Sequence, residues 1–443
     1  AIIMMAGIYY GAMYGGSTTA ILINIPGEAA AVVTTLDGYQ LARQGRAGPA
    51  LAIAAIASFV AGTLAVFGLM LVAPPLAEIA LAFQSPEYVA LILLGLTLLA
   101  YVSAGSTLQA LMTASAGILL GAVGAEPVNG IERMTFNLPG LVDGFGLVPV
   151  MIGLFGIAEV LENLRHRMRH AADTAPLGRL MPSRTELRAS AMPVVRGSSI
   201  GFFVGLLPGG NAIIAALMAY AIERRTSRTP DRFGTGAIEG VAAPEAANNA
   251  ASVSSFVPLL TFGIPTNAII ALLLAALLIH NVVPGPQLIT RNPEIFWGTI
   301  VSMHLGNAML LFLNLPLVGL WVRLVRMPYP YLFPLILVFC LLGAYTVGNS
   351  IFDVAVAIGF GVLGYAMKRT GFEPAPLIFA FVLGPMFEEN LRRTLIVSGG
   401  SFQVFLDRPI ALGLIFCAML VVALPLAMPA VRLAITAAKN ARE

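Results

Sequence analysis

Charged residues are scarce in this chain, where Asp, Glu, Lys and Arg together make up 11% of 443 residues. A soluble globular domain carries about 25% charged residues, so this composition excludes an ordinary soluble protein. The net charge of +3 is too small to indicate a nucleic-acid partner, and we expect none.

Cysteine is also rare, because the chain contains only Cys340 and Cys417, and both lie in apolar segments. Two such residues do not imply a disulfide framework. The chain has neither a P-loop lysine motif nor the HExxH motif of metalloproteases, so we expect no ATP hydrolysis and no catalytic metal. We also find no nucleophile paired with a base, and we expect a protein that is not an enzyme and needs no cofactor.

Apolar residues are abundant and make up 58% of the chain. Apolar runs recur along its whole length, and each is near the ~20 residues that a transmembrane helix needs. The clearest runs are Leu51–Val72, Val89–Ala104, Ile200–Ala221, Trp297–Val322 and Ala411–Met428. The alternating short segments of a β-barrel are not visible. We therefore expect an all-α polytopic protein in a lipid bilayer.

One sequence pattern occurs twice in this apolar background. Gly15-Gly16-Ser17-Thr18-Thr19 leads through an apolar stretch to Asn24-Ile25-Pro26-Gly27-Glu28. Much later, Ser254-Ser255 leads to Gly263-Ile264-Pro265-Thr266-Asn267. Proline removes a backbone donor and breaks a helix, and helices that break at membrane depth typically bind a substrate or an ion. The repeated pattern therefore predicts two broken helices or re-entrant hairpins.

Matching loops of the two halves carry opposite charge patterns. Arg43 and Arg46 follow the first motif, whereas the matching loop at His280 has no Lys or Arg. The positive-inside rule then puts matching loops on opposite sides of the membrane. Inverted-topology repeats of this kind are typical of secondary transporters, and we expect an elevator type of transporter.

The two expected repeats cover residues 1–164 and 197–443, and residues 165–196 form an arginine-rich linker that we expect to be cytoplasmic. The second repeat has an additional broken element at Pro208, for which the first repeat has no room. We therefore expect the first repeat to be truncated at its N-terminus.

The predicted site for substrate and ion consists of polar and backbone-breaking residues at the three broken elements and just before the second motif. Free N–H groups at a helix N-terminus attract an anion, whereas free carbonyls at a C-terminus attract a cation. The predicted residues are Ser17, Thr18, Thr19, Asn24, Pro26, Gly27, Glu28, Pro208, Gly209, Gly210, Asn211, Asn248, Asn249, Gly263, Pro265, Thr266 and Asn267.

Two further acidic residues, Glu245 and Asp353, are candidates for a relay that couples transport to a cation. Alternatively, Asp353 lies near a helix end or in a polar contact between helices. The alternative, purely structural interpretation of each broken element is a kink whose hydroxyls bond back to the helix. For the segment around Asn248 the structural interpretation is a solvated loop or cap.

Several long motifs resemble the large membrane subunit of the tripartite tricarboxylate transporter family. They are Tyr14–Glu28, Leu36–Gly48, Glu239–Ala250 and Leu383–Asn390, and the resemblance covers essentially the whole chain. It implies uptake of di- or tricarboxylates across the bacterial inner membrane, driven by a sodium or proton gradient. It also implies two partners, a small four-helix membrane subunit and a periplasmic substrate-binding protein.

The alternative function on the same scaffold is a passive carboxylate or anion channel. The chain departs from the family where Thr266-Asn267 follows Pro265, because a glycine usually stands directly after that proline. The departure lies in the predicted site, so the resemblance assigns a class of carboxylate and no single substrate.

Overall fold

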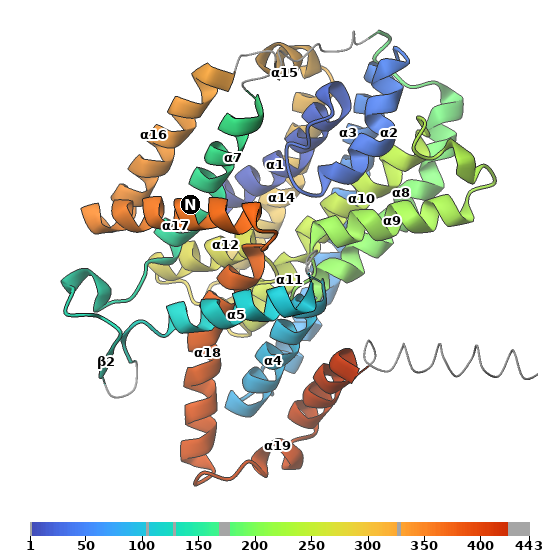
Figure 1. Ribbon diagram of the computed structural model, residues 1–443. Helices are drawn as coiled ribbons and strands as arrows, with labels where there is room; N and C mark the ends of the chain where they lie inside the picture. Colours follow the sequence, from blue (N-terminus) through green and yellow to red (C-terminus); the bar gives the residue numbers. More distant parts are fainter. Residues whose placement is uncertain (1, 103–105, 127–129, 168–177, 326–328, 424–443) are drawn as a thin grey trace, which may run out of the picture. The chain divides into compact units, whose positions relative to one another are not determined.

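The computed structural model describes residues 2–102, 106–126, 130–167, 178–325 and 329–423, which are helical apart from one pair of two-residue strands (Figure 1). The chain divides into two compact units. The first consists of residues 1–81 and 147–365, and the second consists of residues 82–146 and 366–443.

The first unit holds most of the helices. Before residue 230 these are α1 (Ile2–Ile23), α2 (Ala31–Arg43), α3 (Ala47–Ala80), α6 (Leu147–Met151), the π-helical turn η2 (Ile152–Ile157), α7 (Ala158–Arg167), α8 (Arg184–Leu206) and α9 (Ala212–Thr226). From residue 230 they are η3 (Pro230–Arg232), α10 (Glu239–Ser254), α11 (Phe256–Phe262), α12 (Ala268–Ile279), α13 (Leu288–Arg291), α14 (Pro293–Asn314), α15 (Val318–Val325), α16 (Tyr329–Gly348) and most of α17 (Ile351–Arg369).

Five helical segments in the described part of the chain are long and apolar enough to cross a membrane. They are Ala47–Ala80, Leu147–Leu164, Arg184–Leu206, Pro293–Asn314 and Ile351–Arg369. Helices satisfy every backbone donor and acceptor internally, which a bilayer requires because it offers no water. The expectation of an all-α polytopic membrane protein is therefore confirmed.

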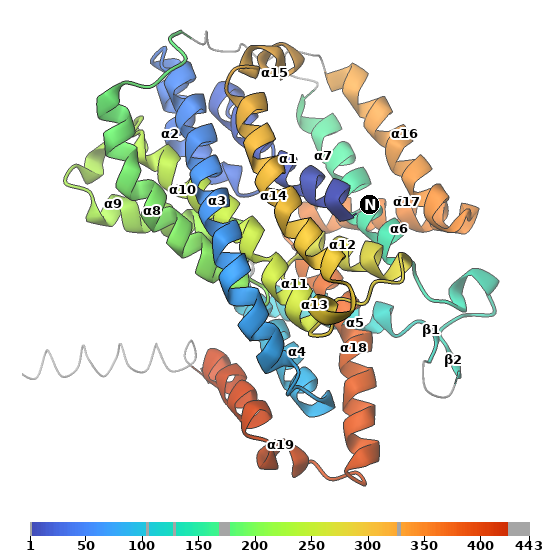
Figure 2. The ribbon, with the colours of Figure 1, turned by 180° about the vertical axis from the view of Figure 1, so that it is seen from behind.

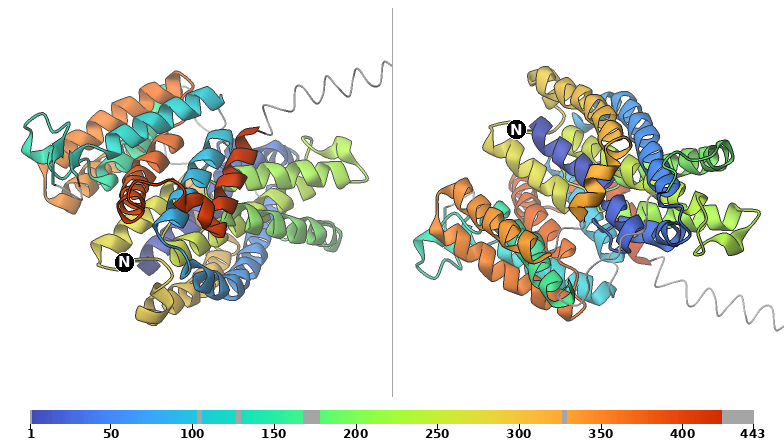
Figure 3. Two further views of the ribbon diagram at one scale, coloured as in Figure 1. Left: turned by 90° about the horizontal axis from the view of Figure 1, so that it is seen from below. Right: turned by 90° about the horizontal axis from the view of Figure 1, so that it is seen from above.

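Helices α8 and α10 pack with unusually small separation, and α9 runs alongside α8 (Figure 3). Three glycines of α8, spaced four residues apart, face α10: a Cβ on Gly197, Gly201 or Gly205 would lie 2.2–2.3 Å from an atom of α10. The facing residues of α10 are Ala243, Ala247, Ala251 and Ser254. Small residues at such spacing let two helix backbones approach, which is how membrane helices gain packing without a hydrophobic driving force.

Helix α3 packs against both α10 and α14, and α1 also contacts α3 and α14 (Figure 2). Asn307 of α14 links the three helices. Its Oδ1 accepts a hydrogen bond from the Tyr14 hydroxyl of α1, and its Nδ2 donates to Thr63 Oγ1 and to the Phe59 carbonyl of α3 at 2.9 and 2.8 Å. A polar link of this kind fixes the arrangement of apolar helices in lipid.

The second unit contains α4 (Ser85–Val102), α5 (Thr107–Gly121), β1 (Gly124–Ala125), β2 (Glu132–Arg133), η1 (Pro139–Leu141), α18 (Ala375–Val397), α19 (Val404–Asp407) and a further apolar helix, Pro409–Ala423. Strands β1 and β2 pair antiparallel. Arg133 of β2 and Arg392 of α18 both contact Glu126 and Glu388, at 2.9–3.7 Å, so this charge network ties the strand pair to α18.

The structure refines two of the expected segments. The run Ile200–Ala221 contains the predicted break at Pro208, because α8 ends at Leu206 and α9 begins at Ala212. The segment 165–196 is not a linker throughout, since α8 begins at Arg184. Ser183 and Glu186 form a capping box there, with the Ser183 side chain accepting from the Glu186 N–H and Glu186 accepting from the Ser183 N–H. Residues 168–177 of this segment lie outside the described residues.

Candidate functional site

The first predicted break lies between α1 and α2, and its loop folds back onto α1. The Gly27 N–H donates to the Gly16 carbonyl at 3.2 Å. A Cβ on Gly27 would lie 2.7 Å from the Gly16 Cα, so neither position has room for a side chain. Asn24 begins the loop with a left-handed φ of 56°, and Pro26 is exposed at its tip. The glycines of this motif therefore serve a close approach of two backbone segments.

Glu28 connects this loop to α10. One of its carboxylate oxygens accepts from the Ala30 N–H at 2.7 Å, close to the start of α2, where a helix N-terminus favours negative charge. The other oxygen accepts from Nδ2 of Asn248 at 2.9 Å. Residues 220 positions apart in the chain thus meet at the predicted site.

Glu245 is fully buried, and three hydroxyl groups surround its carboxylate. Ser17 of α1 donates to Oε2 at 2.6 Å, Ser58 of α3 donates to the same oxygen at 3.5 Å, and Thr34 of α2 donates to Oε1. No Lys or Arg is among the groups that contact this carboxylate in the described chain. Burial of a carboxylate without a cationic partner is costly, so these hydrogen bonds stabilise only part of the charge.

Asn248 and Asn249 follow Glu245 by one helical turn and face different neighbours. Asn249 donates to Ser58 Oγ at 2.7 Å, whereas Asn248 donates to Glu28. The side-chain oxygen of each amide is buried and has no hydrogen-bond partner among the described residues. Buried acceptors are rarely left unpaired, so both oxygens are candidates for contact with a ligand.

The second predicted break begins at Gly263, which ends α11 with a φ of 69°. Pro265 and Thr266 follow, and Thr266 is buried with no partner for its hydroxyl among the described groups. Asn267 caps α12 by accepting from the Ile270 N–H at 3.0 Å. Its Nδ2 lies 3.5 Å from both the Tyr9 hydroxyl and Ser255 Oγ. Helix α1 therefore contacts both breaks.

The Pro208 element forms the third break, between α8 and α9. Gly209 has a φ of 79°, and a Cβ on Gly210 would collide with the Val204 carbonyl. Asn211 caps α9 by accepting from the Ile213 N–H at 3.1 Å. These contacts are local, so the described hydrogen bonds do not join this element to Glu28 or Glu245.

Three other predicted residues occupy distinct places. Thr18 is buried beside Ser17. The Thr19 hydroxyl donates back to the Gly16 carbonyl at 3.2 Å, as the purely structural interpretation of the break expects. Asp353 lies in the first turn of α17 and takes no part in the hydrogen bonds around Glu245. Ser350 precedes that helix and accepts from the Phe352 N–H at 3.2 Å, so Asp353 marks a helix start.

Sequence reasoning missed Thr34, Ser58 and Asp37 as parts of the site. Asp37 is fully buried and accepts from the backbone N–H groups of residues 234, 236 and 237 and from the Tyr220 hydroxyl, all at 2.8–2.9 Å. It thereby fastens α2, the helix that also carries Thr34, to the loop that precedes α10. An acidic residue in a mostly apolar segment is the signal that could have indicated Asp37.

Comparison with known proteins identifies the protein family that this chain resembles. Residues 1–379 match the model of the tripartite tricarboxylate transporter TctA family. The chain is 47% identical over 431 residues to an uncharacterized 52.8 kDa protein in the TAR-I ttuC' 3'region of Agrobacterium vitis, which covers 97% of this chain and 86% of that protein. It is 48% identical over 232 residues to an uncharacterized protein in the TAR-II ttuC' 3'region of the same organism. That match covers 52% of this chain and 96% of the relative. No solved structure matches significantly.

Proposed function

We propose that this chain is the large membrane subunit of a secondary transporter for di- and tricarboxylates, because it belongs to the tripartite tricarboxylate transporter TctA family. The membership confirms the resemblance seen in the sequence and the expectation of a permease without enzymatic activity. Tricarboxylate transport as part of a tripartite system follows from the family. The driving cation, the substrate and the positions of the binding groups are our inference.

The observation that carries the coupling mechanism is the environment of Glu245. A fully buried carboxylate held by three hydroxyls, with no basic group in contact among the described residues, lacks a counter-charge. A proton or a sodium ion supplies that charge, and hydroxyl and amide oxygens are ligands suited to a hard cation. We assign Glu245 as the coupling group in preference to Asp353, which marks the start of α17.

The substrate site is the neighbouring region between Glu28, Asn248 and the second break. The N-terminus of α12 favours a carboxylate, and Thr266 adds a buried hydroxyl that has no partner among the described residues. A substrate carboxylate that accepts from Asn248 displaces Glu28 from that amide. Substrate and cation sites then share α10 through the adjacent residues Asn248 and Asn249, and occupation of one changes the hydrogen bonds of the other.

The wider arrangement completes the proposal. The two halves are inverted repeats that work by an elevator movement, in the bacterial inner membrane, with the segment 165–196 on the cytoplasmic side. A small four-helix membrane subunit and a periplasmic substrate-binding protein act as partners. The repeated broken helices and the opposite loop charges of the sequence support these points.

Uptake by the reconstituted complex tests the function. Proteoliposomes receive a panel of radiolabelled di- and tricarboxylates, with an inward sodium gradient, an inward proton gradient or neither. A coupled transporter concentrates its substrate inside only when the correct cation gradient is present. A passive channel, which is the alternative function, stops at the equilibrium concentration under all three conditions.

A further inference from the structure

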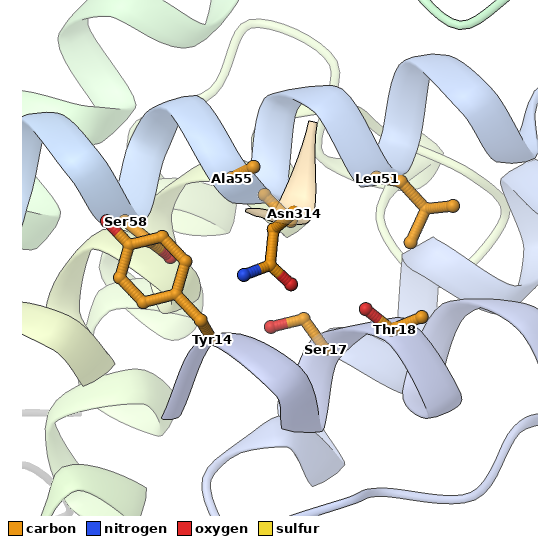
Figure 4. Close-up of a pocket in the computed structure, with 8 residues that line it drawn as sticks. Tyr14, Ser17, Thr18, Leu51, Ala55, Ser58 and Asn314 are labelled. Atoms are coloured by element: carbon orange, nitrogen blue, oxygen red, sulfur yellow. The ribbon is translucent and has the colours of Figure 1, made fainter. Parts of the chain in front are cut away.

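A small cavity lies between α1, α3 and the C-terminal end of α14 (Figure 4). Its polar lining consists of Tyr14, Ser17, Thr18, Ser58 and Asn314. Every lining residue except Asn314 is buried. Asn314 therefore stands at the mouth of the cavity, where the cavity meets the surroundings.

The inner end of this cavity adjoins Glu245. Ser17 and Ser58 line the cavity and also donate to the same carboxylate oxygen, Oε2, whereas Thr34 holds the other oxygen from the side of α2. Two hydroxyls thus separate the cavity from one oxygen of the buried carboxylate. Asn249, whose amide oxygen has no partner within the described part of the chain, donates to Ser58 at 2.7 Å and lies just behind this pair.

The mouth and the wall of the cavity are held in place by hydrogen bonds. Nδ2 of Asn314 donates to the Leu310 carbonyl one turn earlier at 2.9 Å, which leaves its Oδ1 as the end of the amide that can meet a cation. Figure 4 shows this carboxamide among the labelled side chains of α1 and α3. Tyr14 is tied through Asn307 to α3, so the wall cannot simply collapse.

We propose that this cavity is the path by which the coupling cation reaches Glu245, and that Asn314 is the positioning residue at its entrance. This inference rests on the proposed function, because it assumes that Glu245 binds the cation. It adds that the cation enters between α1, α3 and α14, apart from the substrate groups at Glu28 and Thr266. A cation on this path meets hydroxyl and amide oxygens at its entrance and at its inner end, which replace part of its hydration shell.

A reversible block at position 314 tests the path. Asn314→Cys is made in a background in which Cys340 and Cys417 are replaced by alanine, and the complex is reconstituted in proteoliposomes. A trimethylammonium methanethiosulfonate reagent then places a bulky positive group at the entrance. We expect net uptake driven by the cation gradient to fall by at least about fivefold, and a thiol reductant to restore it.

Substrate exchange at saturating cation on both sides serves as the internal comparison, because exchange does not require the cation to leave. We expect exchange in the labelled protein to stay within about twofold of the unlabelled protein. Asn163→Cys is the matched control, since Asn163 makes the same bond to a carbonyl one turn earlier at 3.0 Å but lies outside the cavity lining. Labelling there leaves both activities unchanged.

Asn314→Leu, which needs no labelling, is the second variant and should also reduce net uptake more than exchange. The path is refuted if labelled Asn314→Cys keeps full net uptake, or if net uptake and exchange fall together in both variants. Failure of the proposed function is a different result, because wild-type uptake would then not require a cation gradient at all.

Discussion

Glu245→Gln tests the centre of the proposed coupling mechanism. The substitution keeps the size of the side chain and removes its charge, and the three hydroxyls can rotate to accept as well as donate. Since Glu245 is fully buried, no water compensates for the lost charge. We therefore expect the variant to fold and to lose affinity for the coupling cation.

The size of the effect follows from the loss of one charge pair. Two unit charges about 4 Å apart at an effective dielectric constant of about 20 attract each other by about 4 kcal/mol. That free energy corresponds to a cation half-saturation constant roughly 1,000-fold higher, so cation-dependent uptake should vanish at ordinary concentrations. The affinity for substrate, measured by binding at saturating cation where this can be reached, should change much less.

The assay is initial uptake into proteoliposomes as a function of sodium concentration and, separately, of pH. Thermal unfolding in detergent verifies that the variant is folded. Glu78→Gln is the matched control, because Glu78 lies on an exposed face of α3 and outside the Glu245 cluster. If Glu245→Gln retains a cation half-saturation constant within about threefold of the wild type, Glu245 is not the coupling group.

Three further predictions concern the geometry around this centre. Gly27→Ala should lower the free energy of unfolding by about 1–3 kcal/mol, because its Cβ would lie 2.7 Å from the Gly16 Cα. Gly15→Ala is the control and should be neutral in the same thermal unfolding experiment, because its Cβ meets nothing within 4 Å. Asp37→Ala should cost about 3 kcal/mol, since the backbone N–H groups of residues 234, 236 and 237 would lose the Oδ1 acceptor that they share, and equal stability of this variant and the exposed Asp143→Ala would contradict the anchoring role. Asn248→Ala should raise the KM for substrate about tenfold while leaving the cation half-saturation constant unchanged, and the opposite pattern in uptake kinetics would exchange the two roles.

Composition and pattern could predict an all-α membrane protein, the broken helices and many residues of the candidate site. Apolar runs near the length of a bilayer and a proline within such a run carry their structural consequence locally. The three breaks accordingly lie at the predicted prolines, with a glycine or an asparagine in the left-handed region at each. Polar residues beside the breaks are costly in lipid, and for this reason they could be identified as candidates for a binding site.

Which of these polar residues meet was decided by tertiary structure alone. Ser17, Thr34 and Ser58 belong to three different helices, and each is unremarkable in its own segment. They converge on Glu245 because α1, α2 and α3 all pack against α10, an arrangement that local sequence does not encode. Asp353 takes no part in the hydrogen bonds around Glu245, although both are acidic residues of apolar helices. Local pattern determines where the chain breaks, whereas the contacts that give a buried carboxylate its partners depend on which helices become neighbours.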